Sequence, residues 1–152
     1  MQRIHVLFVC LGNICRSPMA EAIFRHKVEA AGLAEQFMID SAGTGDWHIG
    51  NRPHRGTLAI LKQHRISDSG LSARQVQVED FTRFDYIVAM DRQNRQDLLE
   101  RGADSDRITL MLDFLPESDK QDVPDPYLTC NFYEVYEMLE RSCTLLLEEN
   151  RK

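Results

Sequence analysis

Residues 4 to 18 read IHVLFVCLGNICRSP, and this stretch predicts a strand, a tight loop and the start of a helix. The run from Ile4 to Val9 is apolar and rich in β-branched residues, which is typical of a strand buried on both faces. The run ends at Cys10. After Pro18 the apolar residues recur with the spacing of a helix, so Ser17 is expected to be the N-cap and Pro18 the first helical residue.

The loop after Cys10 has the composition of an oxyanion site. Gly12 and Asn13 are the residue types that most readily accept a positive φ. A loop bent there turns the backbone N–H groups of residues 11 to 16 inward, and the positive end of the following helix adds to the field. Arg16 has a planar guanidinium that can hold two oxygens of a tetrahedral oxyanion. A thiol in such a field ionises readily, and a thiolate facing phosphate can attack phosphorus.

The alternative is that Cys10 is a small core residue, as strand-end cysteines often are. The spacing Cys-x5-Arg is a weak signal by itself, although Cys10 is the only one of the four cysteines with Arg at that offset. The strand before it, Gly and Asn within the loop, and the Ser-Pro and helix after it favour catalysis.

The segment VCLGNICRSPMAEAIF, residues 9–24, resembles the signature loop and first helix of the low-molecular-weight protein tyrosine phosphatases. Further matches are DSAGT at 40–44, DW at 46–47, ARQ at 73–75, FDYIVAMD at 84–91 and PDPY at 124–127. The resemblance implies a hydrolase that acts on phosphotyrosine proteins and other aryl phosphate monoesters through a cysteinyl-phosphate. It implies no metal and no cofactor, with inorganic phosphate as product and inhibitor.

A general acid must protonate the leaving oxygen, and Asp125 is the first candidate. It lies between two prolines in a long acidic loop expected over residues 113–130. Asp-Pro is also a common turn former, so the residues alone leave both interpretations open. The resemblance implies that Asp125 is the acid, with Asp122 as the fallback, and makes Cys10, Arg16 and Asp125 the catalytic set.

The remaining candidate residues would bind the substrate. Ser17 is expected to donate to the Cys10 sulfur and Asn13 to lock the loop by side-chain hydrogen bonds. Trp47 and Tyr127 could wall a cleft and stack on a phenyl ring, although a lone Trp often only packs. The residues expected to contact the bound group are Leu11, Gly12, Asn13, Ile14, Cys15, Ser17, Trp47 and Tyr127.

Three points of the resemblance bear on specificity and regulation. Relatives that act on phosphoarginine tend to carry Thr at the position of Ile14, so Ile14 favours phosphotyrosine. Many relatives have a His before ARQ that supports Ser17 and Asn13, whereas residues 70–72 are Gly, Leu and Ser here. Cys15 could form a reversible disulfide with Cys10 under oxidation, or it could simply pack beneath the loop.

Three rival functions stay open. An arsenate reductase on the same scaffold would need further cysteines near the third strand, and residues 80 to 102 contain none. A phosphoarginine phosphatase would keep the mechanism and change the substrate. A non-catalytic phosphate-binding or redox-sensing module would be expected to lack the nucleophile or the acid, and neither is missing.

Composition sets the broad class. The 152 residues, 43% apolar and 28% charged, predict one domain over residues 1–152. A net charge of −6 argues against nucleic-acid binding, and no apolar run is long enough for a membrane span. No signal segment is recognised, so we expect a cytoplasmic protein, as a monomer or weak dimer.

Strands alternate with amphipathic helices, which predicts an α/β fold with a doubly wound, four-stranded parallel sheet flanked by helices. In such folds ligands bind beyond the carboxyl ends of the strands, where Cys10 would stand. Further strands are expected at 37–41, 86–90 and 108–112, helices at 56–64, 91–101 and 131–149, a helical turn at 80–83, and an extended piece near 72–78.

Overall fold

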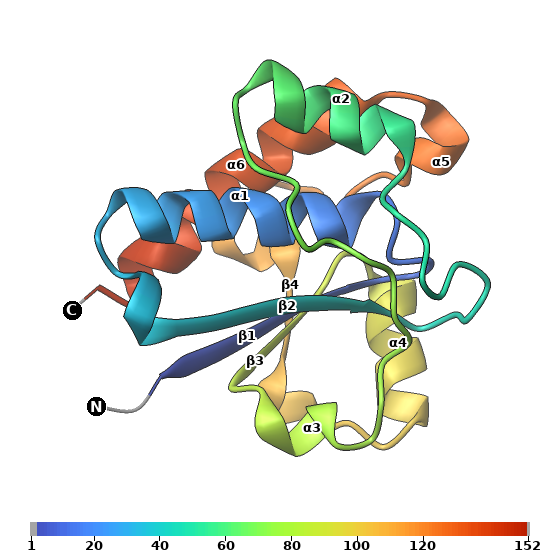
Figure 1. The fold of residues 1–152 in the computed structure, drawn as a ribbon. Coiled ribbons are helices and arrows are strands. Elements are labelled where there is room, and N and C mark those ends of the chain that lie inside the picture. The colour runs from blue at the N-terminus through green and yellow to red at the C-terminus, as the bar shows by residue number, and fades with distance from the viewer. Residues whose placement is uncertain (1–2, 152) are drawn as a thin grey trace.

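The four strands form one parallel sheet in the order β2-β1-β3-β4 (Figure 1). They are β1 (Ile4–Cys10), β2 (Phe37–Gly43), β3 (Tyr86–Ala89) and β4 (Ile108–Leu110). The computed structural model describes residues 3 to 151, so residues 1, 2 and 152 of the predicted domain lie outside the described part. The predicted sheet is confirmed, with a fourth strand two residues shorter than expected.

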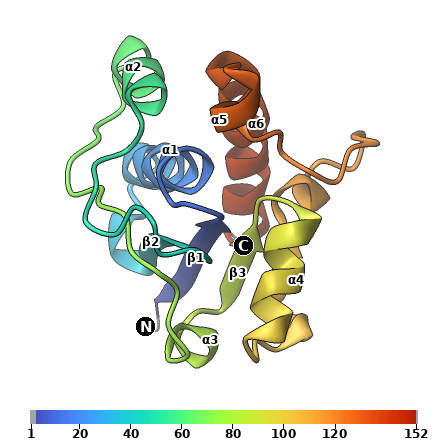
Figure 2. The same cartoon turned by 90° about the vertical axis from the view of Figure 1, so that its right-hand side faces the viewer.

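Helices cover both faces of the sheet (Figures 1 and 2). On one side lie α1 (Arg16–Ala30), α2 (Arg55–Gln63), α5 (Pro126–Thr129) and α6 (Phe132–Glu149). On the other side lie α3 (Asp80–Arg83) and α4 (Arg92–Glu100). Short 3-10 turns are η1 (Ala34–Gln36), η2 (Ser105–Arg107) and η3 (Met111–Phe114). Within residues 3–151 no helix has the length and apolar character that crossing a membrane requires.

The predicted helices are confirmed with small shifts of their ends, but the predicted loop over 113–130 is partly wrong. The expected loop over 113–130 begins inside η3 and contains α5, which Asp125 caps by accepting a hydrogen bond from the Tyr127 amide. The brief extended piece expected near residues 72–78 is present, and it pairs with the sheet through one parallel bridge from Gln75 to Gly43.

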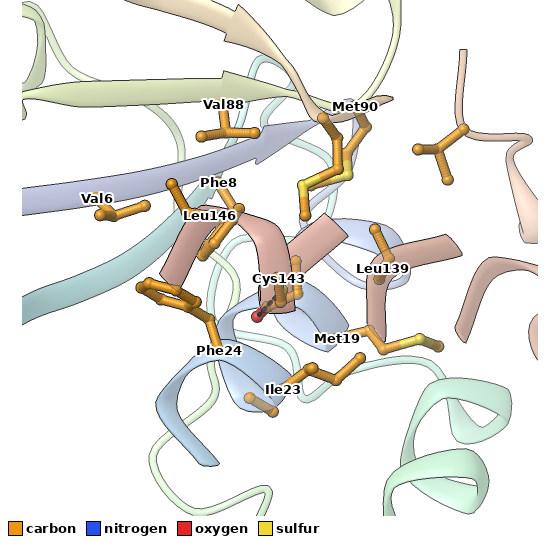
Figure 3. Close-up of a cluster of buried hydrophobic side chains, with 14 of the residues drawn as sticks. Val6, Phe8, Met19, Ile23, Phe24, Val88, Met90, Leu139, Cys143 and Leu146 are labelled. Atoms are coloured by element: carbon orange, nitrogen blue, oxygen red, sulfur yellow. Dashed lines mark hydrogen bonds between the residues drawn. The ribbon is translucent and has the colours of Figure 1, made fainter. Parts of the chain in front are cut away.

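Strand β1 is buried on both faces, as its apolar run predicts. Val6 and Phe8 belong to the cluster beneath α1 and α6, where the Phe8 ring lies edge-on to Phe24 with centroids 5.9 Å apart (Figure 3). Leu7 and Val9 point to the other cluster, beneath α3 and α4. The carboxyl end of β1 therefore lies at the centre of the sheet with packed side chains above and below it.

The start of α1 differs from the prediction. The helix begins at Arg16, and Cys15 occupies the N-cap position without a side-chain cap hydrogen bond. Ser17 is therefore not the N-cap, and its fully buried hydroxyl bonds within the site instead. Because α1 packs against β1 and β2 and lies beside α6 on the same face of the sheet, its first turn gives the preceding loop a fixed support.

Candidate active site

The loop between β1 and α1 places Cys10 and Arg16 at the same end of the sheet. Asn13 has a φ of 56°, as expected for this residue. Gly12 does not have the positive φ that was expected; instead a Cβ there would lie 3.0 Å from Cδ2 of His48. The amide of Asn13 donates to the Cys10 sulfur at 3.3 Å, and Ser17 Oγ lies 3.0 Å from that sulfur. The Cys10 sulfur therefore accepts a hydrogen bond from one loop amide and lies within hydrogen-bond distance of the Ser17 hydroxyl.

A cavity of about 200 Å³ opens above this loop, and Cys10 forms part of its wall. Trp47 and Tyr127 stand at its rim, where they are 68% and 58% exposed. Asn13 and Ser17 do not line the cavity and are buried behind the loop. The lining consists of Cys10, Leu11, Gly12, Ile14, Cys15, Arg16, Trp47, His48, Asp125 and Tyr127.

Arg16 is buried and held in place by acceptors from two distant segments. Its Nη1 donates to Asp91 Oδ2 at 2.7 Å and to the Val123 carbonyl at 3.0 Å. Its Nη2 lies 3.7 Å from Asp125 Oδ2. Its Nε is buried and has no hydrogen-bond partner among residues 3–151. A buried donor of this kind needs an acceptor, which an oxyanion in the cavity would supply.

The two candidate acids have different surroundings. Asp125 lines the cavity, and its Oδ1 accepts from the Tyr127 amide at 3.0 Å while Oδ2 faces Arg16. Asp122 does not line it and forms a two-point ion pair with Arg92, with bonds of 3.2 and 3.0 Å. The hydrogen bonds from Arg92 lower the pKa of Asp122, so that carboxyl is poorly suited to carry a proton. The geometry favours Asp125 as the acid.

Asn13 makes the side-chain hydrogen bonds expected of a residue that locks the loop. Its Oδ1 accepts from the Arg74 amide at 3.0 Å. Its Nδ2 donates to Ser17 Oγ at 2.7 Å and to Ser41 Oγ at 3.0 Å. The loop is therefore tied through Asn13 to Ser17, to Ser41 on β2 and to the Arg74 backbone.

Cys15 lies next to Cys10 in the wall of the cavity, and both are free thiols. Burial raises the pKa of Cys15 to about 12, and the neighbouring Cys10 and Asp125 add to the effect. Cys15 therefore remains a neutral thiol near pH 7. Within residues 3–151 no three His, Cys, Asp or Glu side chains are grouped as a metal site would require.

Comparison with known proteins identifies the family. Residues 5–152 match the model of the family described as "Low molecular weight phosphotyrosine protein phosphatase". The chain belongs to this family. Over 151 residues it is 50% identical to the low molecular weight protein-tyrosine-phosphatase YfkJ of Bacillus subtilis, covering 98% of this chain and 97% of YfkJ. The prediction of a cysteine-dependent phosphotyrosine-protein phosphatase is confirmed at the level of the family.

Solved structures agree with this assignment. The crystal structure of YfkJ from Bacillus subtilis has a TM-score of 0.96 at 48% identity and covers 100% of this phosphatase and 99% of that chain. The crystal structure of DARP, a Drosophila arginine phosphatase, has a TM-score of 0.88 at 34% identity, covering 97% and 98%. The scaffold is therefore shared by relatives whose names give different phosphorylated residues.

Four residues of the phosphatase site were not predicted from the sequence: Ser41, His48, His54 and Asp91. Asp91 follows β3 and Ser41 lies near the end of β2, so the carboxyl ends of the strands beside β1 bring both toward the loop. His54 donates its amide to the Ile14 carbonyl at 2.7 Å, and its ring stacks on Phe132 with centroids 5.0 Å apart. The strand order is the signal that would have pointed to Asp91 and Ser41.

Proposed function

We propose that this phosphatase hydrolyses phosphotyrosine in proteins, with Cys10 as nucleophile, Arg16 as phosphoryl-binding residue and Asp125 as acid and base. The Cys10 thiolate attacks phosphorus while the bond to the phenolic oxygen breaks, and Asp125 gives that oxygen its proton. Asp125 then takes a proton from water, whose oxygen attacks phosphorus. The P–S bond breaks, its electron pair returns to sulfur, and inorganic phosphate leaves as product and competitive inhibitor.

The observation that carries this proposal is that Cys10, Arg16 and Asp125, separated by up to 115 residues in the chain, all line one cavity. Arg16 is aligned by Asp91 before any ligand binds, so the site needs little reorganisation when charge develops on the equatorial oxygens. The Nε of Arg16, which has no partner in the described part of the chain, is a further donor available to the oxyanion.

The remaining loop residues bind and orient the phosphoryl group in this proposal. Their backbone amides face the oxyanion, with Ser17 and Asn13 acting from behind the loop. Trp47 and Tyr127 hold the phenyl ring of phosphotyrosine, since two exposed aromatic side chains at the rim offer flat apolar surfaces. The binding residues are Leu11, Gly12, Asn13, Ile14, Cys15, Ser17, Trp47 and Tyr127.

The cellular setting is part of the same proposal. The chain acts as one domain, residues 1–152, in the cytoplasm, where a reducing compartment keeps the nucleophilic thiol reduced. It is a monomer or a weak dimer. Oxidant joins Cys10 and Cys15 in a reversible disulfide, which protects Cys10 from irreversible oxidation.

The test is turnover of p-nitrophenyl phosphate and of peptides that carry phosphotyrosine, phosphoserine or phosphoarginine, measured in EDTA. Cys10→Ser is expected to abolish turnover and to retain vanadate binding. Asp125→Asn is expected to slow phenyl phosphate by about 10²- to 10⁴-fold, and p-nitrophenyl phosphate less, because the better leaving group needs less help from an acid.

Asp122→Asn is the matched control, with the same chemical change three residues away. Equal losses for Asp122→Asn and Asp125→Asn would contradict the assignment of the acid. Preference for phosphoarginine would retain the mechanism and overturn the choice of phosphotyrosine. Substantial turnover by Cys10→Ser would overturn the assigned nucleophile.

A further inference from the structure

A chain of buried hydrogen bonds runs from the Cys10 sulfur to a carboxylate on the far side of the loop. Glu21, on α1, is 6% exposed and has no contact with the cavity. Its Oε1 accepts from Ser41 Oγ at 2.6 Å, and its Oε2 accepts from Arg25 Nη2 at 2.6 Å. Ser41 is in turn bonded to Asn13, and Asn13 to Ser17, which touches the sulfur.

The carboxylate of Glu21 fixes which group donates and which accepts in each of these hydrogen bonds. Ser41 has one hydroxyl hydrogen, and the carboxylate of Glu21 can only accept, so Ser41 gives its hydrogen to Glu21. The oxygen of Ser41 is then left to accept from Asn13 Nδ2. The second N–H of that amide goes to the Ser17 oxygen, because the Arg74 amide holds the other end of the Asn13 side chain.

Ser17 therefore receives a hydrogen bond on its oxygen and keeps its own hydroxyl hydrogen for the Cys10 sulfur, 3.0 Å away. We propose that Glu21 is a positioning residue for catalysis: through Ser41 and Asn13 it orients Ser17 as a hydrogen-bond donor to the sulfur. This inference rests on the proposed role of Cys10 as nucleophile. We call the five residues Glu21, Ser41, Asn13, Ser17 and Cys10 the serine relay.

The relay acts mainly in the second step of the reaction. When water attacks the phosphocysteine, the P–S bond breaks and its electron pair goes to sulfur, while Asp125 holds the proton taken from the water. A hydroxyl that donates to sulfur stabilises this negative charge and makes sulfur a better leaving group. Reversal of the Ser17 hydroxyl would remove that donor at the moment the charge appears.

The ionised carboxylate of Glu21 does not stabilise the folded protein. Burial raises the pKa of Glu21, and nearby Asp40 adds to this, while hydrogen bonds from Ser41 and Arg25 oppose it. Arg74, the other charged group nearby, is engaged with Asp40 and Asp80. A carboxyl with a raised folded-state pKa binds its proton more tightly when folded, so stability falls as pH rises through the raised pKa. The ionised form costs stability and supplies orientation.

The experiment compares Glu21→Gln with wild type, and with Glu140→Gln as the matched control. Glu140 accepts from Lys27 of the same helix α1 at 2.9 Å, so the control makes the same change to an α1 ion pair outside the relay. The first readout is the pH midpoint for alkylation of Cys10 by iodoacetate. In Glu21→Gln the single amide oxygen faces the Arg25 guanidinium, so the NH2 group faces Ser41 and the Ser41 hydroxyl loses its acceptor. We therefore expect the midpoint to move up by about one pH unit, which corresponds to one hydrogen bond to a charged group, and to stay at the wild-type value in Glu140→Gln.

The second readout is the burst of p-nitrophenol in stopped flow, which separates formation of the phosphocysteine from its breakdown. Breakdown, and with it kcat, is expected to fall about tenfold in Glu21→Gln, while kcat/KM changes less than about threefold. The melting temperature near pH 7 is expected to stay at or above the wild-type value, because the variant no longer buries this charge. A purely structural role would instead lower the melting temperature and leave the alkylation midpoint in place.

A double-mutant cycle with Ser41→Ala tests the route. If Glu21 acts through Ser41, the double variant breaks down phosphocysteine no more slowly than Ser41→Ala alone. Additive losses would overturn the relay, as would a wild-type alkylation midpoint in Glu21→Gln. Substantial turnover by Cys10→Ser would instead count against the proposed function, and the alkylation profile would still report on the relay.

Discussion

Asp91→Asn tests how far the active site depends on the ion pair between the buried guanidinium of Arg16 and the carboxylate of Asp91. Arg16 Nη1 and Asp91 Oδ2 are 2.7 Å apart, with side chains 3% and 20% exposed. Two unit charges about 4 Å apart interact by about 4 kcal/mol at an effective dielectric constant of about 20. Part of this survives in the variant, because the amide oxygen of Asn still accepts and the Val123 carbonyl stays in place. We expect a net loss of about 2 kcal/mol.

In a domain of this size that loss lowers the melting temperature by about 4–8 °C. Saturating phosphate should narrow the difference, because the bound oxyanion then supplies the counter-charge that the neutral amide of the variant lacks. Differential scanning calorimetry with and without phosphate measures both effects.

Asp97→Asn is the control, since Asp97 is on α4, the helix that Asp91 caps, and its side chain accepts only from Gln93 at 3.0 Å among the described residues. It should melt within about 2 °C of wild type, because surface pairs contribute little. The reasoning is refuted if Asp91→Asn has the same melting temperature as wild type. It is also refuted if phosphate leaves the difference between the two melting temperatures unchanged.

Three further outcomes follow from the geometry. Tyr127→Ala should raise KM for a phosphotyrosine peptide about fivefold and leave inhibition by inorganic phosphate unchanged, since in the proposed complex the ring packs on the aryl group and not on the phosphoryl group; equal weakening of both would contradict its role as a wall. Cys15→Ser should recover less activity with dithiothreitol after peroxide than wild type, as mass spectrometry of Cys10 sulfinic acid would show; equal recovery would argue against the disulfide. Phe24→Ala should lose about 3–5 kcal/mol in urea unfolding, because its fully buried ring meets Phe8 and Phe37 edge-on; a loss below about 1 kcal/mol would mean that the core closes around the gap.

The sheet and the larger helices could be predicted because their signals are local. The apolar run of β1 and the helical spacing after Pro18 depend only on neighbouring residues, and both are confirmed. The short helix α5 was missed although Asp125 and Pro126 have the types preferred at an N-cap and at N1. Asp-Pro also forms turns, and four residues are too few for a helical period to show.

The supports of the site could not be predicted in the same way, because their partners are far apart in the chain. Arg16 meets Asp91 across 75 residues, and Asn13 meets Ser41 across 28. Ser17 shows the same effect as an error: the local pattern predicts an N-cap, yet in the fold its hydroxyl bonds to Cys10 and Asn13. Tertiary partners override a local preference worth only about 1 kcal/mol.

The contrast between a buried floor and an exposed rim has a consequence for how this enzyme can change. Cys10, Asn13, Arg16 and Ser17 are each at most 2% exposed, so almost any substitution there disturbs the core as well as the chemistry. Trp47 and Tyr127 are mostly exposed, and surface substitutions typically alter folding free energy by less than about 0.5 kcal/mol. New substrate preferences can therefore be selected at the rim without first acquiring stabilising mutations elsewhere, and a combinatorial library confined to these two positions should yield mostly folded proteins.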